Sequence, residues 1–586
     1  MKDEDAETGR HGDTENHRVS ASPRLRVLVR PSSFILGLLT AIVLLYGVLY
    51  PNLTVVTTSL QQNGSWTLAN YRDVLSQQSI LEAMLNSVLL SVGTVALCAA
   101  VGVPLAFLFE RYTFPGRRVF SVLAALPLVL PPLVGTIAFI FLLGESGILA
   151  HTIQNILNLE TAPWTLRGWT ALLLFHTYTM YPFFYVLTGA GLKRIDASLA
   201  ESARSLGANK ITVLRRVLLP QLTPSLIAAA LLTFMTSMAS FSAPLFFGGS
   251  VRVLTLEIYT ARQRGDMVTA VTETVVLAII SLAALILFQR YEGTRRFVAA
   301  AMKGAPRRRV EINRGPARTF ATLAAILFSV ALFCPVLTLI LVSFAREGSW
   351  TTQTLPAAYT FANYVRLINE PQASEVFVNS FLMSAVAAIG ALLWSFCVVS
   401  LVATGRSQSR LRSYWTRLIS VLVLIPWALP GTVVAVSIAE AYGQPSLLLG
   451  SFVLVGTFWI LAVVYFLRFM PLVVRAVQAS TEQIDPSLPE AAGSLGAHAW
   501  TRFARVTLPL VWPGAIAGTL LAFVIALGEY VASVLVFVPA NRPISIAIAS
   551  EMRDFNLGTA AAYGVVLIGI IAIVMVAAGK LERLRA

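Results

Sequence analysis

The chain has few charged residues for its length. Asp, Glu, Lys and Arg make up 12% of its 586 residues, whereas soluble domains average about 25%. So few charges cannot cover a water-facing surface of this size, which excludes a large soluble globular protein. Cysteine is also scarce: Cys98, Cys334 and Cys397 lie far apart inside apolar runs, so neither a disulfide nor a metal site is expected. No cluster of His, Cys, Asp or Glu has the spacing of metal ligands, and no cofactor is expected.

A phosphate-binding loop of the form G-x-x-x-x-G-K-[ST] is absent as well. Such a loop supplies the backbone N–H groups and the lysine that hold the phosphates of ATP. The chain is therefore not its own ATPase of this type, and no catalytic residue is assigned.

Long apolar runs are present throughout. Hydrophobic residues make up 56% of the chain, and runs of roughly 20 apolar residues, the length that crosses a bilayer, recur along it. These runs predict an all-α polytopic membrane protein with about twelve transmembrane helices. They are expected at residues 34–58, 84–109, 119–143, 168–190, 223–247, 270–289, 320–344, 378–403, 416–440, 448–470, 512–538 and 558–579. Aromatic residues expected at the membrane interface are Trp66, Tyr71, Trp350 and Tyr364.

The positive charge follows the expected topology. The formal net charge is +15, and the Lys and Arg residues gather in alternate loops between the apolar runs. This distribution indicates orientation in the membrane, with both termini in the cytoplasm, and gives no reason to expect nucleic acid as a partner. Residues 1–30 are expected to form a disordered cytoplasmic tail, and residues 291–318 a basic cytoplasmic linker.

A polar segment occurs twice. The seven residues that begin at Glu201 and end at Gly207 return as a segment from Glu490 to Gly496, an offset of 490 − 201 = 289 residues in a chain whose half is 586/2 = 293. Further matches at nearly the same offset are Leu219-Pro220 with Leu508-Pro509, Leu68-Ala69-Asn70-Tyr71 with Phe361-Ala362-Asn363-Tyr364, and Asn86-Ser87 with Asn379-Ser380. The chain is thus predicted to contain two halves, residues 31–290 (core 82–290) and 319–586 (core 376–580). Because each half has six spans, the two repeats are parallel.

Each copy predicts a short helix, a turn and a second helix. Asp196 and Asp485 are suited to start the first helix, because a carboxylate accepts hydrogen bonds from its free N–H groups. Gly207 and Gly496 permit the bend that follows. Both copies are predicted on the cytoplasmic side.

The pattern Glu-Ala-Ala, three residues, Gly, and later Leu-Pro resembles the cytoplasmic signature of permease subunits in binding-protein-dependent ABC importers. The resemblance covers nearly the whole chain after the tail, once per half, and implies the type I importer fold. In that family the segment is a coupling helix that docks in a cleft of the ATP-hydrolysing subunit. The residues that the resemblance assigns to coupling are Glu201, Ser202, Ala203, Gly207 and Ala208, and Glu490, Ala491, Ala492, Gly496 and Ala497. Ser202 stands where the family usually has Ala, and it is still small.

The resemblance also implies partners. It implies two copies of a separate ABC ATPase subunit on the cytoplasmic side, an extracytoplasmic solute-binding protein, and a multi-pass location in the cell (inner or plasma) membrane. The chain itself would be the permease and not an enzyme.

A secondary transporter is the competing class, because such proteins also have twelve spans in two halves. They carry ionisable residues at membrane depth, and the candidates here are Glu529, Glu440 and His176. For His176 a hydrogen-bonded interior role is the favoured interpretation. The position equivalent to Glu529 is 529 − 289 = 240, a serine. The predicted translocation pathway therefore contains Ser240, Phe241, Ser242, Glu529 and Tyr530.

The cargo is less firmly indicated. The stretch from Ser240 through Pro244 to Gly249, followed by Leu256 to Tyr259, is most similar to ferric-iron-type permeases. Permeases for thiamine, phosphonate, polyamine and sulfate share the repeated segment and remain alternatives.

Overall fold

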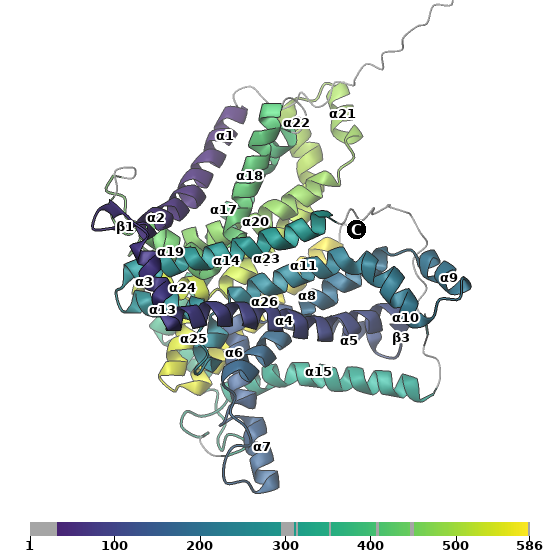
Figure 1. The fold of residues 1–586 in the computed structure, drawn as a ribbon, viewed down its shortest axis with the longest axis vertical. Coiled ribbons are helices and arrows are strands. Elements are labelled where there is room, and N and C mark those ends of the chain that lie inside the picture. Colours follow the sequence, from purple (N-terminus) through teal and green to yellow (C-terminus); the bar gives the residue numbers. More distant parts are fainter. Residues whose placement is uncertain are drawn as a thin grey trace, which may run out of the picture.

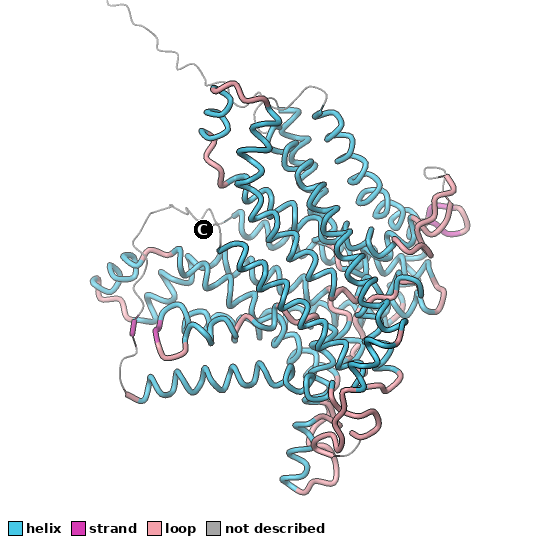
Figure 2. The backbone as a smooth tube through the Cα atoms, turned by 180° about the vertical axis from the view of Figure 1, so that it is seen from behind, coloured by secondary structure: helices cyan, strands magenta, loops and turns pink. Residues whose placement is uncertain are grey.

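A computed structural model describes residues 32–294, 310–311, 315–350, 353–405, 410–445 and 450–583. The predicted tail and most of the predicted linker lie outside these ranges. Figure 2 shows helices through almost all of the described chain, with strands confined there to two short pairs. The expectation of an all-α protein is therefore confirmed.

The helices of the first half, before the linker, are interrupted at several points. In chain order the elements are α1 (Ser32–Ile42), the π-helix η1 (Val43–Leu49), α2 (Tyr50–Ser59), β1 (Gln61–Gln62), β2 (Ser65–Trp66), α3 (Ala69–Ser76), α4 (Gln78–Arg111), β3 (Tyr112–Thr113), α5 (Arg117–Leu123), the 3-10 helix η2 (Leu126–Leu128), α6 (Pro132–Leu143), α7 (Ile148–Leu157), α8 (Gly168–Arg194), α9 (Ala197–Ser205), α10 (Lys210–Val213), the π-helix η3 (Leu214–Leu218), α11 (Leu219–Met238), α12 (Ser242–Phe247), α13 (Leu254–Gln263) and α14 (Met267–Thr294).

The second half repeats much of this order. Its elements are β4 (Val310–Glu311), which pairs with β3, then α15 (Pro316–Ser343), α16 (Ala362–Asn369), α17 (Pro371–Gly405), α18 (Arg410–Ala428), α19 (Gly431–Ala441), α20 (Ile460–Glu482), α21 (Ser487–Ser494), α22 (Ala499–Arg502), the π-helix η4 (Phe503–Thr507), α23 (Leu508–Leu527), α24 (Val531–Val536), the 3-10 helix η5 (Pro539–Asn541), α25 (Ile544–Arg553) and α26 (Leu557–Arg583).

Ten helices in the described ranges are long and apolar enough to cross a membrane, and eleven if one bent pair counts as a single span. The bent pair covers the predicted span 416–440 and turns by 106° between α18 and α19. The predicted span 168–190 corresponds to α8, which has 27 residues and packs against α4 and α11 but is not among the ten. The difference from about twelve thus comes from one bent span and one more polar helix.

Proline and glycine explain where predicted spans are broken or displaced. The span 119–143 is divided into α5, η2 and α6, because Pro131 and Pro132 offer no N–H group to continue a helix. The span expected at 448–470 is α20, which begins only at Ile460. Gly450 (φ +63°) and Gly456 (φ +86°) adopt left-handed conformations that hold the preceding residues out of the helix.

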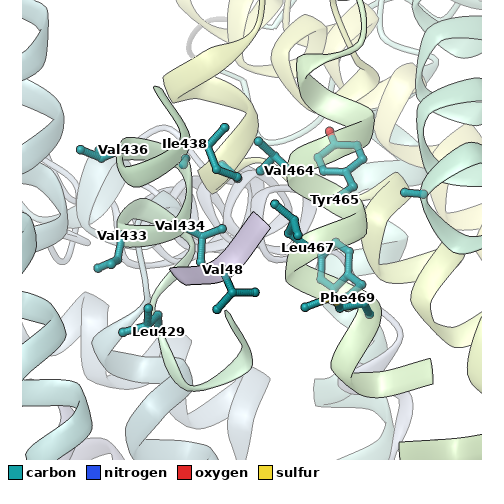
Figure 3. Close-up of a cluster of buried hydrophobic side chains, with 14 of the residues drawn as sticks. Val48, Leu429, Val433, Val434, Val436, Ile438, Val464, Tyr465, Leu467 and Phe469 are labelled. Atoms are coloured by element: carbon teal, nitrogen blue, oxygen red, sulfur yellow. The ribbon is translucent and has the colours of Figure 1, made fainter. Parts of the chain in front are cut away.

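The first helix of each half packs against the other half. Segment α1–η1–α2 contacts α17, α18 and α19 of the second half, in addition to α14 of its own half. Helix α15 contacts α5 and α6 of the first half, in addition to α26 of its own half. Figure 1 shows segment α1–η1–α2 beside α18, and α15 beside α5. In Figure 3 the side chain of Val48 from η1 lies between α19 and α20. Gly47 permits this approach, since a Cβ there would lie 2.5 Å from Leu467 Cδ2.

The Asn-Tyr pair found by sequence repetition closes the same local structure in both halves. Asn70 Nδ2 donates to the carbonyl oxygens of Ser59 and Gln61, both at 3.0 Å, and the Tyr71 hydroxyl lies 2.6 Å from Ser59 Oγ. In the second half Asn363 Nδ2 donates to the carbonyl oxygens of Ser343 and Ala345, both at 2.9 Å. The Tyr364 hydroxyl lies 2.6 Å from Ser343 Oγ. The tyrosine hydroxyls therefore form hydrogen bonds within the protein. This structural role was not part of the expectation that Tyr71 and Tyr364 lie at the membrane interface.

The Asn-Ser pair is also explained. Ser87 Oγ accepts from Leu254 N at the start of α13, at 3.0 Å, and Ser380 Oγ accepts from Ile544 N at the start of α25, at 2.7 Å. Each serine thus caps a helix of its own half from a distant part of the chain. The Asn-Tyr and Asn-Ser pairs that repeat in the sequence therefore make equivalent hydrogen bonds in the two halves.

Candidate functional site: the repeated segments and the helix breaks

The first repeated segment, residues 196–220, has the predicted helix–turn–helix form. Asp196 accepts a hydrogen bond from Ser198 N at 2.9 Å and caps α9. At the other end Gly207 has φ +86°, and Ala208 N donates to Ala203 O at 3.0 Å. This bond across a left-handed glycine closes the helix and reverses the chain.

The second repeated segment, residues 485–509, reproduces these contacts. Asp485 accepts from Ser487 N at 2.9 Å, and hydrogen bonds from Ser487 lower the pKa of this carboxyl group. Gly496 has φ +79°, and Ala497 N donates to Ala492 O at 3.0 Å. The predicted helix starts and glycine turns are therefore confirmed in both copies.

The two segments also agree in side-chain exposure. Glu201 and Glu490 are exposed, while Ala203 and Ala492 are half-buried. Ser202 and Ala491 are exposed as well, and Ala208 and Ala497 are half-buried.

Large apolar side chains on each segment face away from the protein. Leu206 is 89% exposed and Leu495, at the same offset of 495 − 206 = 289, is 88% exposed. Ile211 and Trp500 form a second exposed pair, and Leu199 and Leu488 a third. Sequence reasoning did not assign Leu206 and Leu495 a role, although both lie inside the repeated heptapeptide. Exposed apolar side chains that recur at the same offset make these two surfaces candidate interaction sites.

A π-helical turn joins each segment to the following membrane helix. η3 and η4 occupy equivalent positions, since 503 − 214 = 289, and they lead into α11 and α23. Single π-helical turns occur preferentially at functional sites.

The two following membrane helices are broken at the same place. α11 ends at Met238 and α12 begins at Ser242, while α23 ends at Leu527 and α24 begins at Val531, an offset of 289 at both points. Four predicted pathway residues, Ser240, Phe241, Glu529 and Tyr530, lie in these breaks, and the fifth, Ser242, starts α12 and is buried.

The two halves meet at these breaks. The rings of Phe241 and Tyr530, which are equivalent positions, lie 5.8 Å apart. Phe241 is 1% and Tyr530 5% exposed. A Cβ on Gly528 would lie 2.9 Å from Pro131 Cβ, so the second break also approaches the start of α6 closely. The structure thus brings Phe241 and Tyr530 together between the halves.

In the first half Ser240 belongs to a closed hydrogen-bond network. His176 Nε2 lies 2.9 Å from Ser240 Oγ, and His176 Nδ1 lies 3.2 Å from both Thr94 Oγ1 and Ser237 Oγ. His176 is fully buried. The interior, hydrogen-bonded role favoured for this histidine is confirmed.

In the second half the equivalent break contains charges. Glu529 Oε1 accepts from Ala532 N at 3.0 Å, and its Oε2 lies 3.2 Å from Arg468 Nε. The position equivalent to His176 is 176 + 289 = 465, where the Tyr465 hydroxyl lies 2.7 Å from Ser533 Oγ. Sequence reasoning missed Arg468, although a lone arginine inside an apolar run was a visible signal.

Glu440, the third ionisable candidate, lies near the end of α19 and accepts a hydrogen bond from Thr58 Oγ1 at 3.2 Å. It joins α19 to α2 and does not reach the breaks. Within the described ranges no group of three His, Cys, Asp or Glu side chains is arranged to hold a metal ion.

Two fused helical repeats, each with an exposed polar segment and a broken membrane helix, define a two-half membrane permease. Residues 102–296 and 397–585 match the family described as "Binding-protein-dependent transport system inner membrane component", and the chain belongs to this family. Its fold is that of a type I ABC importer permease with two fused halves, as the resemblance implied.

Individual relatives agree with this assignment. The chain is 32% identical over 509 residues to the probable ABC transporter permease protein y4fN of Sinorhizobium fredii, covering 85% of this chain and 87% of the relative. It is 25% identical over 552 residues to the ferric transport system permease protein FbpB of Actinobacillus pleuropneumoniae, with 92% and 77% covered. It is also 34% identical over 215 residues to the molybdenum transport system permease protein ModB of Mycobacterium bovis, with 36% and 78% covered.

Proposed function

We propose that this protein forms the translocation pathway of an ATP-binding-cassette importer and couples it to separate ATPase subunits. The repeated exposure of apolar side chains on the two segments carries this proposal. Two equivalent surfaces fit two copies of one ATPase subunit, whereas a secondary transporter has no need of them. ATP hydrolysis belongs to those partners, and this chain acts as permease.

The spatial arrangement supports such coupling. Figure 1 shows α9 and α10 at one end of the molecule and α21 and α22 at another, well separated from each other. The broken helices, by contrast, meet through Phe241 and Tyr530. Movement of the two segments toward each other would turn the two halves about this contact. We propose that the contact closes the pathway on one side and that Ser240, Ser242 and Glu529 line it when it opens.

The proposed orientation places both repeated segments and both chain ends in the cytoplasm, within the inner or plasma membrane. The distribution of Lys and Arg supports it. An extracytoplasmic solute-binding protein would deliver cargo on the opposite side, where the halves meet. We propose residues 31–290 and 319–586 as the two permease halves. The first helix of each half packs partly against the other half.

Ferric iron is the proposed cargo. The ferric permease relative aligns over most of this chain as one polypeptide with two halves, which supports iron. The molybdenum permease relative aligns over little more than one third of the chain, and molybdate is the second candidate. Thiamine, phosphonate, polyamine and sulfate remain alternatives from sequence resemblance.

The coupling is tested by Gly207→Pro combined with Gly496→Pro. Proline has φ near −65° and cannot occupy either left-handed turn. We expect the double variant, reconstituted in vesicles with its ATPase and receptor, to lose receptor-stimulated ATP hydrolysis while the membrane helices remain folded.

Gly265→Pro is the matched control, since Gly265 also has a positive φ (+80°) but lies outside both segments. Stimulated hydrolysis that survives in the double variant would contradict the coupling role. Uptake of labelled ferric iron, molybdate and phosphonate by the same vesicles identifies the cargo.

A further inference from the structure

We propose that Arg468, together with the start of α19, forms a binding site for a tetrahedral oxyanion inside the pathway. The inference deepens the proposed function and rests on it. It concerns one side chain that the network around the helix breaks leaves incompletely paired.

Arg468 lies within the membrane helix α20, and its side chain is 18% exposed. Nε is 3.2 Å from Glu529 Oε2, a distance that makes an ion pair but without the geometry of a hydrogen bond. Both Nε and Nη1 are buried, and neither has a hydrogen-bond partner in the part of the chain that the structure describes. Buried donors without acceptors are rare in folded proteins.

The guanidinium group rests on the first residue of α19. A Cβ on Gly431 would overlap Arg468 Nη1, so only glycine leaves room for the side chain there. The first N–H groups of a helix have no acceptor within it and carry a partial positive charge. Thr432, the next residue, is fully buried, and its Oγ1 has no partner among the described residues.

The positively charged guanidinium group of Arg468 therefore lies against the partial positive charge at the start of α19. The guanidinium group and the start of α19 repel each other, and Glu529 supplies the nearby carboxylate. One of its oxygens, Oε1, is already bonded to Ala532 N. A second anion would accept from the unpaired groups and remove the repulsion, as anions do at helix starts elsewhere.

The first half has no equivalent of this site. The position matching Arg468 is 468 − 289 = 179, a threonine. Before α19 the offset is 299, because Pro127 and Pro131 match Pro426 and Pro430, so the position matching Gly431 is 431 − 299 = 132, a proline without an N–H group. Position 240 is serine where the second half has Glu529. Within the described residues the site therefore occurs once, in the second half, as a single pathway requires.

The donors define the ligand class. Molybdate, phosphate and phosphonate offer several oxygen acceptors around one centre, and arginine binds such groups through two N–H donors at once. A bare ferric ion would be repelled by the same groups. The oxyanion therefore arrives either free, as cargo, or as a ligand of the ferric ion.

The test is equilibrium binding of labelled molybdate, phosphate and 2-aminoethylphosphonate to the purified full-length protein in lipid nanodiscs, with and without a ferric salt. We expect saturable binding of at least one oxyanion and a loss of about tenfold or more in Arg468→Gln. Arg468→Lys keeps the positive charge but loses the paired N–H donors, so its affinity should lie between those of the original protein and Arg468→Gln. Arg475→Gln, on the same helix with an exposed partner in Gln478, is the matched control and should bind as the original protein does.

Glu529→Gln separates a ligand site from a structural ion pair. If the carboxylate competes with the ligand for Arg468, its neutralisation strengthens binding. The proposal is overturned if Arg468→Gln binds equally well, if no oxyanion binds, or if Glu529→Gln weakens binding as Arg468→Gln does. Binding that requires the ferric salt assigns the anion to the iron, and binding without it assigns the anion as cargo. Failure here with intact receptor-stimulated ATPase would leave the permease function standing.

Discussion

Replacing Leu206 and Leu495 provides the most direct test of whether an ATPase subunit docks on the two repeated segments. Each leucine projects almost fully into solvent, so replacement by alanine removes little packing from the protein itself. If an ATPase subunit buries the side chain, the change removes about three apolar carbons from the interface, at about 0.8 kcal/mol each. After incomplete burial is allowed for, about 2 kcal/mol per site is expected, which corresponds to about 30-fold in the dissociation constant.

The assay is binding of the purified ATPase subunit to the permease in nanodiscs, with Leu206→Ala and Leu495→Ala measured singly and together. Thermal unfolding should be unchanged in both variants. Leu157→Ala is the control, because Leu157 on α7 is 61% exposed but lies outside the repeated segments. A dissociation constant within about twofold of the original in both variants would refute docking through these side chains.

Two further predictions concern local structure. Gly207→Asn should retain more receptor-stimulated ATPase activity than Gly207→Ala, because asparagine tolerates a left-handed turn and no atom crowds the position; equal activities would show that the turn is not required. Gly102→Ala should lower the free energy of unfolding by about 1–3 kcal/mol, because the new Cβ would lie 2.6 Å from Tyr181 O where α4 meets α8. Thermal denaturation in detergent checks this, with Gly569→Ala, where nothing lies within 4 Å, as the control that should not be destabilised.

Local signals in the sequence were sufficient for the repeated segments. An acidic residue before a short helix and a glycine after it encode the cap and the turn directly, so Asp196, Gly207, Asp485 and Gly496 occupy the predicted conformations. Repetition at a fixed offset also paired Ser240 with Glu529 by numbering alone. The helix breaks in which both residues lie were missed, because each was expected inside a continuous span, 223–247 or 512–538.

Contacts between distant parts of the chain were not accessible in this way. Apolar periodicity marks a segment as membrane-spanning but does not say which neighbour it has, so the packing of α1 on the opposite half left no trace in the sequence. The position of Arg468 against Gly431 likewise depends on how α20 crosses the bend before α19. Span ends were displaced wherever glycine or proline opposed the helix inside an apolar run, as at Gly456.

The exchange of first helices has a consequence for how the protein is made. Segment α1–η1–α2 leaves the ribosome first, yet α17, α18 and α19, against which it packs, are synthesised more than three hundred residues later. Until then α2 has α14 of its own half beside it, but the face that meets the second half has only lipid or a temporary partner. Helix α15 later bridges back to a first half that is already inserted. Final assembly of the first half must therefore wait for the second. A polypeptide truncated at the linker would leave uncovered the face of α1–η1–α2 that meets α17, α18 and α19.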